Sequence, residues 1–130
     1  MRALALALLL PLAACDTADV TYPAPGDYAE VELDALLDAD PGRYNLRAAI
    51  ADVEPCPENP DRLILCAAEA TLVLAPSYPV PEDPALLGAF VPVDAPDQFR
   101  VGRRGTFSLE LYRSPTGAAP TFTLLGYALD

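Results

Sequence analysis

The side chains that could do chemistry in this chain are 19 carboxylates, three serines, three cysteines and eight basic residues, all of them arginine. Histidine is absent, which removes the commonest general base and the commonest metal ligand. The serines lie outside any Gly-x-Ser-x-Gly sequence, and no imidazole is present to activate them: Ser77, Ser108 and Ser114. The sequence therefore favours a protein that is not an enzyme. A small hydrolase that uses paired acidic residues is the alternative, and it needs two carboxylates flanking a deep cleft.

The carboxylates do not form a recognisable metal site. The segment Asp38-Ala39-Asp40-Pro41-Gly42 has two acids at the spacing of a calcium loop, but the third acidic ligand and the closing Glu are missing. The end of a helix followed by a turn explains this segment better. We expect no metal and no cofactor.

Arg103 and Arg104, within Gly102-Arg103-Arg104-Gly105, are the only adjacent basic residues in the sequence. They are candidate contacts for an anionic ligand, whereas the alternative is that they offset nearby acids on a strand edge. Tyr78 and Tyr112 are candidate exposed aromatics on which a sugar or base could stack. Their alternative role is to cover the core. A formal net charge of −11 opposes binding to phosphate backbones, so nucleic acid is not an expected partner.

The N-terminus has the pattern of an export signal. Met1-Arg2 gives a positive start, and Ala3 to Ala14 is an apolar run of 12 residues. This run is too short for a permanent membrane-spanning helix, which takes about 18 residues or more. Leu12-Ala13-Ala14-Cys15 resembles the lipobox of bacterial lipoproteins, and the resemblance covers only these first 15 residues. An ordinary secretory signal and a short membrane anchor are the alternatives.

The resemblance implies that residues 1–14 are removed as a signal peptide and that Cys15 carries lipid. It places the protein in the bacterial cell envelope, anchored to a membrane by this lipid and facing the periplasm or the surface. Cys56 and Cys66 are then the remaining cysteines, and this address permits a disulfide between them. The ring of 11 residues would contribute about 2.8 kcal/mol in chain-entropy terms. A two-cysteine metal site and free thiols are the alternatives.

The rest of the chain divides into a flexible tether at 15–26, which includes the lipidated cysteine, and one domain at 27–130. Asp27 and Glu30 resemble a capping box at the start of a helix. A period of two begins at Arg43 and slips near Val53, which predicts a bulge in a long strand. Six prolines between 76 and 99 predict no regular strand there. In chain order the expected elements are a helix at 28–38, a bent strand from 43, strands at 62–67 and 69–75, a short helix at 83–88, and strands at 102–112 and 121–129.

This order predicts a mainly β fold, a small five-stranded Greek-key barrel with one or two short helices. It weakly resembles the OB-fold. The function expected from these features is that of a lipid-anchored, non-enzymatic binding module for another envelope protein. The main alternative is a periplasmic module that binds glycan or peptidoglycan.

Overall fold

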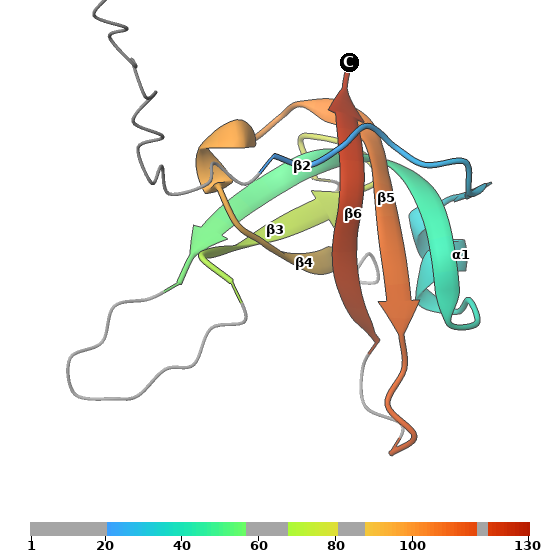
Figure 1. The fold of residues 1–130 in the computed structure, drawn as a ribbon. Coiled ribbons are helices and arrows are strands. Elements are labelled where there is room, and N and C mark those ends of the chain that lie inside the picture. The colour runs from blue at the N-terminus through green and yellow to red at the C-terminus, as the bar shows by residue number, and fades with distance from the viewer. Residues whose placement is uncertain (1–20, 57–67, 81–87, 117–119) are drawn as a thin grey trace, which may run out of the picture.

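The computed structural model describes residues 21–56, 68–80, 88–116 and 120–130. Within these ranges the chain forms one sheet with two short helices (Figure 1). The strands are β1 (Ala29–Val31), β2 (Gly42–Pro55), β3 (Ala70–Ala75), β4 (Ala89–Val93), β5 (Arg104–Tyr112) and β6 (Thr121–Leu129). The helices are α1 (Leu33–Leu37) and the 3₁₀ helix η1 (Pro96–Gln98). Neither helix has the length and hydropathy needed to span a bilayer, among the residues described.

Strands β2 to β6 form a Greek key. Strands β2, β3 and β4 pair in sequence as antiparallel neighbours, and β5 returns to the other edge of β2, which gives the order β4-β3-β2-β5-β6. The sheet curves so that the two end strands, β4 and β6, approach each other without a hydrogen-bonded ladder between them. The predicted mainly β, OB-like Greek-key architecture with short helices is confirmed, but the described sheet has six strands rather than the expected five and forms a half-barrel.

Strand β2 bends where its pairing changes from β5 to β3. Its first half pairs with β5 from Gly42 to Ala49, and its second half pairs with β3 from Ala49 to Pro55. The register with β3 shifts between Ile50 and Asp52. An extra residue on one strand bends it and increases its twist, which lets the sheet curl. The bulge predicted from the slip in alternation is therefore confirmed.

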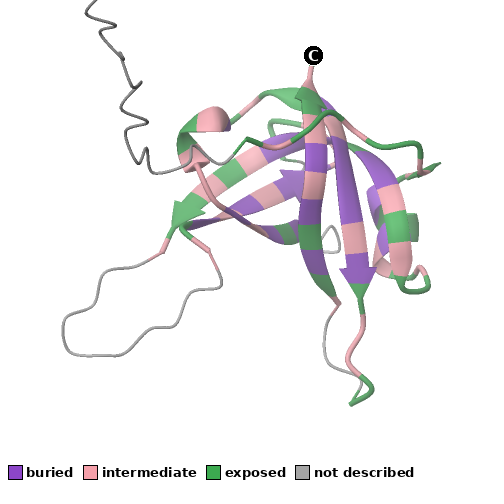
Figure 2. Cartoon of the chain, in the orientation of Figure 1, coloured by how far each residue is buried: buried purple, intermediate pink, exposed green. Residues whose placement is uncertain are grey.

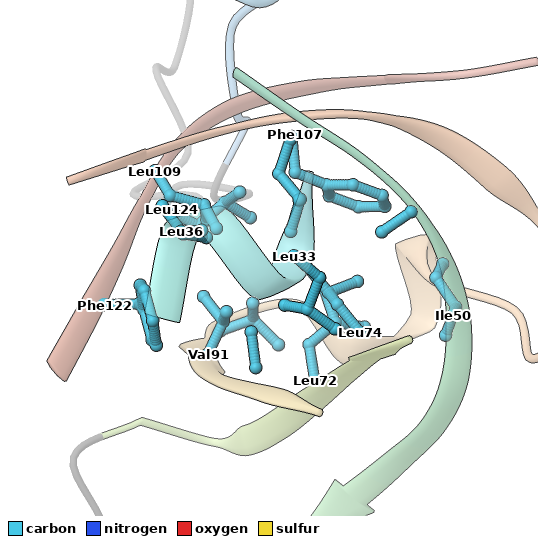
Figure 3. Packing of buried hydrophobic residues seen from close by; sticks show 14 of the residues in the cluster. Leu33, Leu36, Ile50, Leu72, Leu74, Val91, Phe107, Leu109, Phe122 and Leu124 are labelled. Carbon is cyan, nitrogen blue, oxygen red and sulfur yellow. The ribbon is translucent and has the colours of Figure 1, made fainter. Parts of the chain in front are cut away.

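The core fills the concave side of this curved sheet. Side chains from the five strands β2 to β6 and from α1 point into one interior, as Figure 3 shows for Leu36, Ile50, Leu72, Val91, Phe107 and Leu124. The buried bands alternate along β3 and β5 with more exposed ones (Figure 2). Helix α1 closes one end of the half-barrel with two buried leucines, Leu33 and Leu36. This arrangement matches the inward positions expected from the period of two.

The helix expected at 28–38 is wrong in its first half. Residues Ala29–Val31 form β1, which pairs parallel with β2 so that Val31 lies beside Leu46. The helix begins only after Glu32, its N-cap, and no side chain caps it. The capping box of Asp27 and Glu30 is therefore also wrong, because pairing with the free edge of β2 outweighs the local helical pattern.

A strand does form in the proline-rich segment, contrary to the sequence prediction. Strand β4 contains Pro92, opposite Thr71 of β3. A proline is tolerated here because β4 is at the end of the strand order, so it has a ladder on one side only and the missing N–H can face away from β3. The strand expected at 62–67 and, apart from Gly88, the helix expected at 83–88 lie outside the described residues.

Residues 21–28, which we call the N-terminal strap, cross the outer side of β6, β5 and β2 (Figure 1). The amide of Tyr127 donates to Pro23 O at 3.0 Å, and the amide of Gly26 donates to Ser108 Oγ at 3.0 Å. The Tyr22 ring lies 6.0 Å from the ring centroids of Phe99 and Tyr127. Part of the expected tether is thus in contact with the domain, through Tyr22, Pro23 and Gly26, and residues 15–20 lie outside the described ranges.

Candidate functional site

Three of the four predicted ligand contacts gather at one end of the barrel. Arg104 Nη1 donates to Pro76 O at 3.3 Å, two residues before Tyr78. The Tyr78 ring also packs over the turn before Arg103, since a Cβ on Gly102 would lie 3.4 Å from Tyr78 Cδ1. Tyr78 is 51% exposed, so its ring is accessible to a ligand.

The fourth predicted contact, Tyr112, lies elsewhere. It ends strand β5, whereas Arg104 begins it. Eight residues of extended strand separate two positions by about 27 Å. Tyr112 is 61% exposed, but it cannot share a small ligand with Arg104. The structure therefore does not assemble the four residues into one site.

Arg47 joins the arginine pair, and sequence reasoning missed it. The β2–β5 register places Ala49 opposite Arg104, which brings Arg47 to the same region. Asp130 lies between them: its carboxylate accepts from Arg47 Nη1 at 3.2 Å and from Nη2 at 2.6 Å, and its carbonyl accepts from Arg103 Nη2 at 2.6 Å. The signal in the sequence was the outward phase of Arg47 in the predicted strand, but only the register of the sheet identifies its neighbours.

The charges of this cluster are partly compensated. The hydrogen bond from Arg47 lowers the pKa of Asp130. Desolvation by burial opposes this shift, and attraction to Arg47, Arg104 and Arg103 adds to the lowering. The same hydrogen bond raises the pKa of Arg47. Asp130 and Arg47 are thus a bidentate ion pair at neutral pH.

An open depression of about 470 Å³ lies beside this ion pair, and its lining is Glu32, Leu33, Asp34, Arg47, Pro76 and Arg104. A second depression of about 330 Å³ is lined by Glu30, Val31, Glu32 and Arg47. They share Glu32 and Arg47, so we treat them together as the α1 groove. Its size falls in the range of small-molecule sites, about 300–1,000 Å³.

Among the residues that the structure describes, a second exposed surface is the outer face of β3 and β4. Phe90 stands opposite Val73, and Pro92 stands opposite Thr71. Phe90, the second residue of β4, is 54% exposed, and Val73 lies opposite it on the same face. This face can take part in apolar contacts with a partner.

The cysteines are placed only in part. Cys56 follows β2, and its amide donates to Glu69 O at 3.0 Å, which continues the β2–β3 ladder by one bond. Cys66 and Cys15 lie outside the described residues, so the disulfide and the lipidation stay predictions. In the part of the chain that the structure describes, no three of the His, Cys, Asp and Glu side chains are grouped as metal ligands.

Comparisons with known proteins add no family to this picture. No protein-family model matches the chain, and no curated protein matches it.

Proposed function

We propose that this protein is a lipid-anchored component of the bacterial cell envelope and that its half-barrel is a non-enzymatic binding module. The observation that carries the proposal is the lipobox-like sequence Leu12-Ala13-Ala14-Cys15. The docked strap also supports the proposal, because the domain holds Tyr22 and so limits the length of free chain after Cys15. Seven steps of extended chain from Cys15 to Tyr22 span at most about 25 Å. The module is thus held close to the lipid surface.

The anchor is tested by the variant Cys15→Ala in the full chain, expressed in a bacterium. We expect the parent protein to fractionate with membranes and to incorporate a labelled fatty acid. The variant should keep its signal peptide and lose the label, because the thiol that accepts the lipid is gone. Thr17→Ala is the matched control, since it leaves the lipobox intact. Unchanged processing and membrane retention of Cys15→Ala would reject the anchor.

The uncovered face of β3 and β4 supports a protein partner. Phe90 and Val73 provide an apolar patch beside the acidic Asp52 and Glu54 of β2, whose register places them next to β3. A patch of this kind favours a partner with an apolar centre and basic residues around it. Crosslinking in intact cells, with a photoreactive residue in place of Phe90, should capture such a partner. The same residue in place of Tyr112 is the control.

Glycan binding is the second candidate, and the position of Tyr78 beside Arg103 and Arg104 favours it. The aromatic ring can stack on a sugar, and the neighbouring guanidinium groups can pair with a carboxylate that the sugar carries. Sedimentation with isolated peptidoglycan tests this candidate. Retention that falls in Tyr78→Ala but not in Tyr112→Ala would support it, and retention that is equal in both variants would reject it.

A further inference from the structure

We infer that the α1 groove binds a small zwitterion, an amino acid or a short peptide that carries both a carboxylate and an ammonium group. This inference deepens the proposed binding function and rests on it. It depends on opposite charges that line one depression without neutralising each other.

Arg104 supplies the positive side of the groove. Of its five N–H donors, one is used, by Nη1 toward Pro76 O at 3.3 Å. Two ion pairs join described residues, Arg43 with Glu110 and Arg47 with Asp130, and Arg104 is in neither. Among the described residues Arg104 therefore forms no ion pair, although it attracts the nearby Asp130 carboxylate, and its planar fork fits a further carboxylate.

Glu32 and Asp34 supply the negative side. Glu32 is the N-cap residue of α1 but its side chain makes no capping hydrogen bond. Asp34 Oδ1 accepts only from the neighbouring amide of Ala35, at 2.8 Å. Neither carboxylate is within ion-pair distance of an arginine among the described residues. Both nevertheless line the same depression as Arg104.

This arrangement selects against ligands of a single charge. A simple anion at Arg104 is repelled by Glu32 and Asp34, and a simple cation beside the carboxylates is repelled by Arg104. A zwitterion places each charge beside its opposite. Leu33 and Pro76 add apolar surface between the two sides, which suits a small aliphatic side chain. The continuation past Glu30 and Val31 leaves room for a second residue.

The test uses the full mature chain in detergent, titrated by calorimetry with the dipeptide alanyl-alanine. We expect saturable binding that weakens about tenfold or more when the amine is acetylated, and again when the carboxylate is amidated, since charged hydrogen bonds are worth about 1.5–3 kcal/mol each. If acetylation of the amine leaves the affinity unchanged, the groove binds only the carboxylate, and the inference is overturned. Absence of saturable binding would also overturn it.

Variants locate the site. Arg104→Gln should remove the difference between the free and the amidated carboxylate. The double variant Glu32→Gln with Asp34→Asn should remove the difference between the free and the acetylated amine. Arg43→Gln, an exposed arginine outside the groove, is the matched control. If alanyl-alanine does not bind while Phe90 crosslinking and membrane anchoring persist, the zwitterion inference fails and the proposed function stands. If Cys15→Ala keeps its membrane anchoring while alanyl-alanine binds, the proposed lipid anchor fails and the zwitterion site stands.

Discussion

The outer face of the sheet has two regions, and they differ in whether another described segment packs over them. Over β2, β5 and β6 the N-terminal strap covers the sheet, and Asn45 and Ser108, which it contacts, are 8% and 0% exposed. Over β3 and β4 no described segment is hydrogen-bonded across the outer face, and Phe90 is 54% exposed. The polar positions are thus buried and an aromatic position is left uncovered, which inverts the usual arrangement.

The two regions differ in whether their outward side chains have partners within the domain. Asn45 Nδ2 donates to Gly26 O at 2.8 Å and Ser108 Oγ donates to Asn45 Oδ1, so the buried polar groups find their partners in the strap and in each other. A network of this kind is favourable only when every member is satisfied. The covered region is therefore a structural contact, whereas the part of the chain that the structure describes leaves Phe90 on the other region exposed to solvent.

The largest expected effect comes from forcing the strap off the sheet. A Cβ on Gly126 would lie 2.6 Å from Pro23 O and 2.7 Å from Ala24 O, both backbone atoms. Gly126→Ala should therefore lower the free energy of unfolding by about 3 kcal/mol, the upper end of overpacking costs. Chemical denaturation measures it. Gly42→Ala is the control, because its nearest neighbour would be at an ordinary 3.6 Å. Equal losses in both variants would mean that the strap does not contribute.

Removing the polar network should cost somewhat less. Asn45→Ala leaves the Ser108 hydroxyl without its acceptor and Gly26 O without its donor, which we expect to cost about 2 kcal/mol. The double variant with Ser108→Ala should lose less than the sum of the two single variants, because the groups share one network. Additive losses in denaturation experiments would contradict a coupled network.

Tyr127 should give a smaller and pH-dependent effect. Its hydroxyl donates to Gln98 Oε1 at 2.9 Å, and Tyr127→Phe should cost about 1 kcal/mol near neutral pH. Burial raises the pKa of Tyr127 from its ordinary value of 10.0, so the unfolded state releases this proton first as pH rises. The stability from the neutral phenol is complete below pH 10.0 and is lost as pH rises through the folded pKa. A shallower decline for Tyr127→Phe above that pH is the expected result, and an identical profile would argue against it.

The uncovered region should show the smallest change in stability. Phe90→Ser is expected to alter the free energy of unfolding by no more than about 0.5 kcal/mol, as for other surface substitutions. It should nevertheless reduce capture of an envelope partner. A loss of stability comparable to that of Asn45→Ala would erase the distinction between the two regions.

The sequence predicts the barrel well because the signal is local. Alternation places Leu46 and Phe107 inside, and its slip near Val53 marks the bulge that bends β2. Both follow from the fixed period of a strand, which does not depend on distant residues.

The strap and the α1 groove could not be predicted in the same way. The strap is held mainly by backbone atoms, such as the Gly26 amide on Ser108, 82 positions away. The groove depends on the β2–β5 register, which brings Arg47 and Arg104 to one depression. The shortened helix has a similar cause, since β1 pairs with an edge that only the assembled sheet offers.

The docking of Tyr22 also fixes where a shortened recombinant form can begin. A form that starts at Asp27, the first residue of the domain expected from sequence, would lack the ring that packs on Phe99 and the carbonyl that accepts from the Tyr127 amide. Purification of the isolated domain for crystallisation should therefore retain the chain from Thr21 onward. Cleavage by a protease before Thr21 would leave these contacts intact, whereas cleavage after Gly26 would leave a weakened domain.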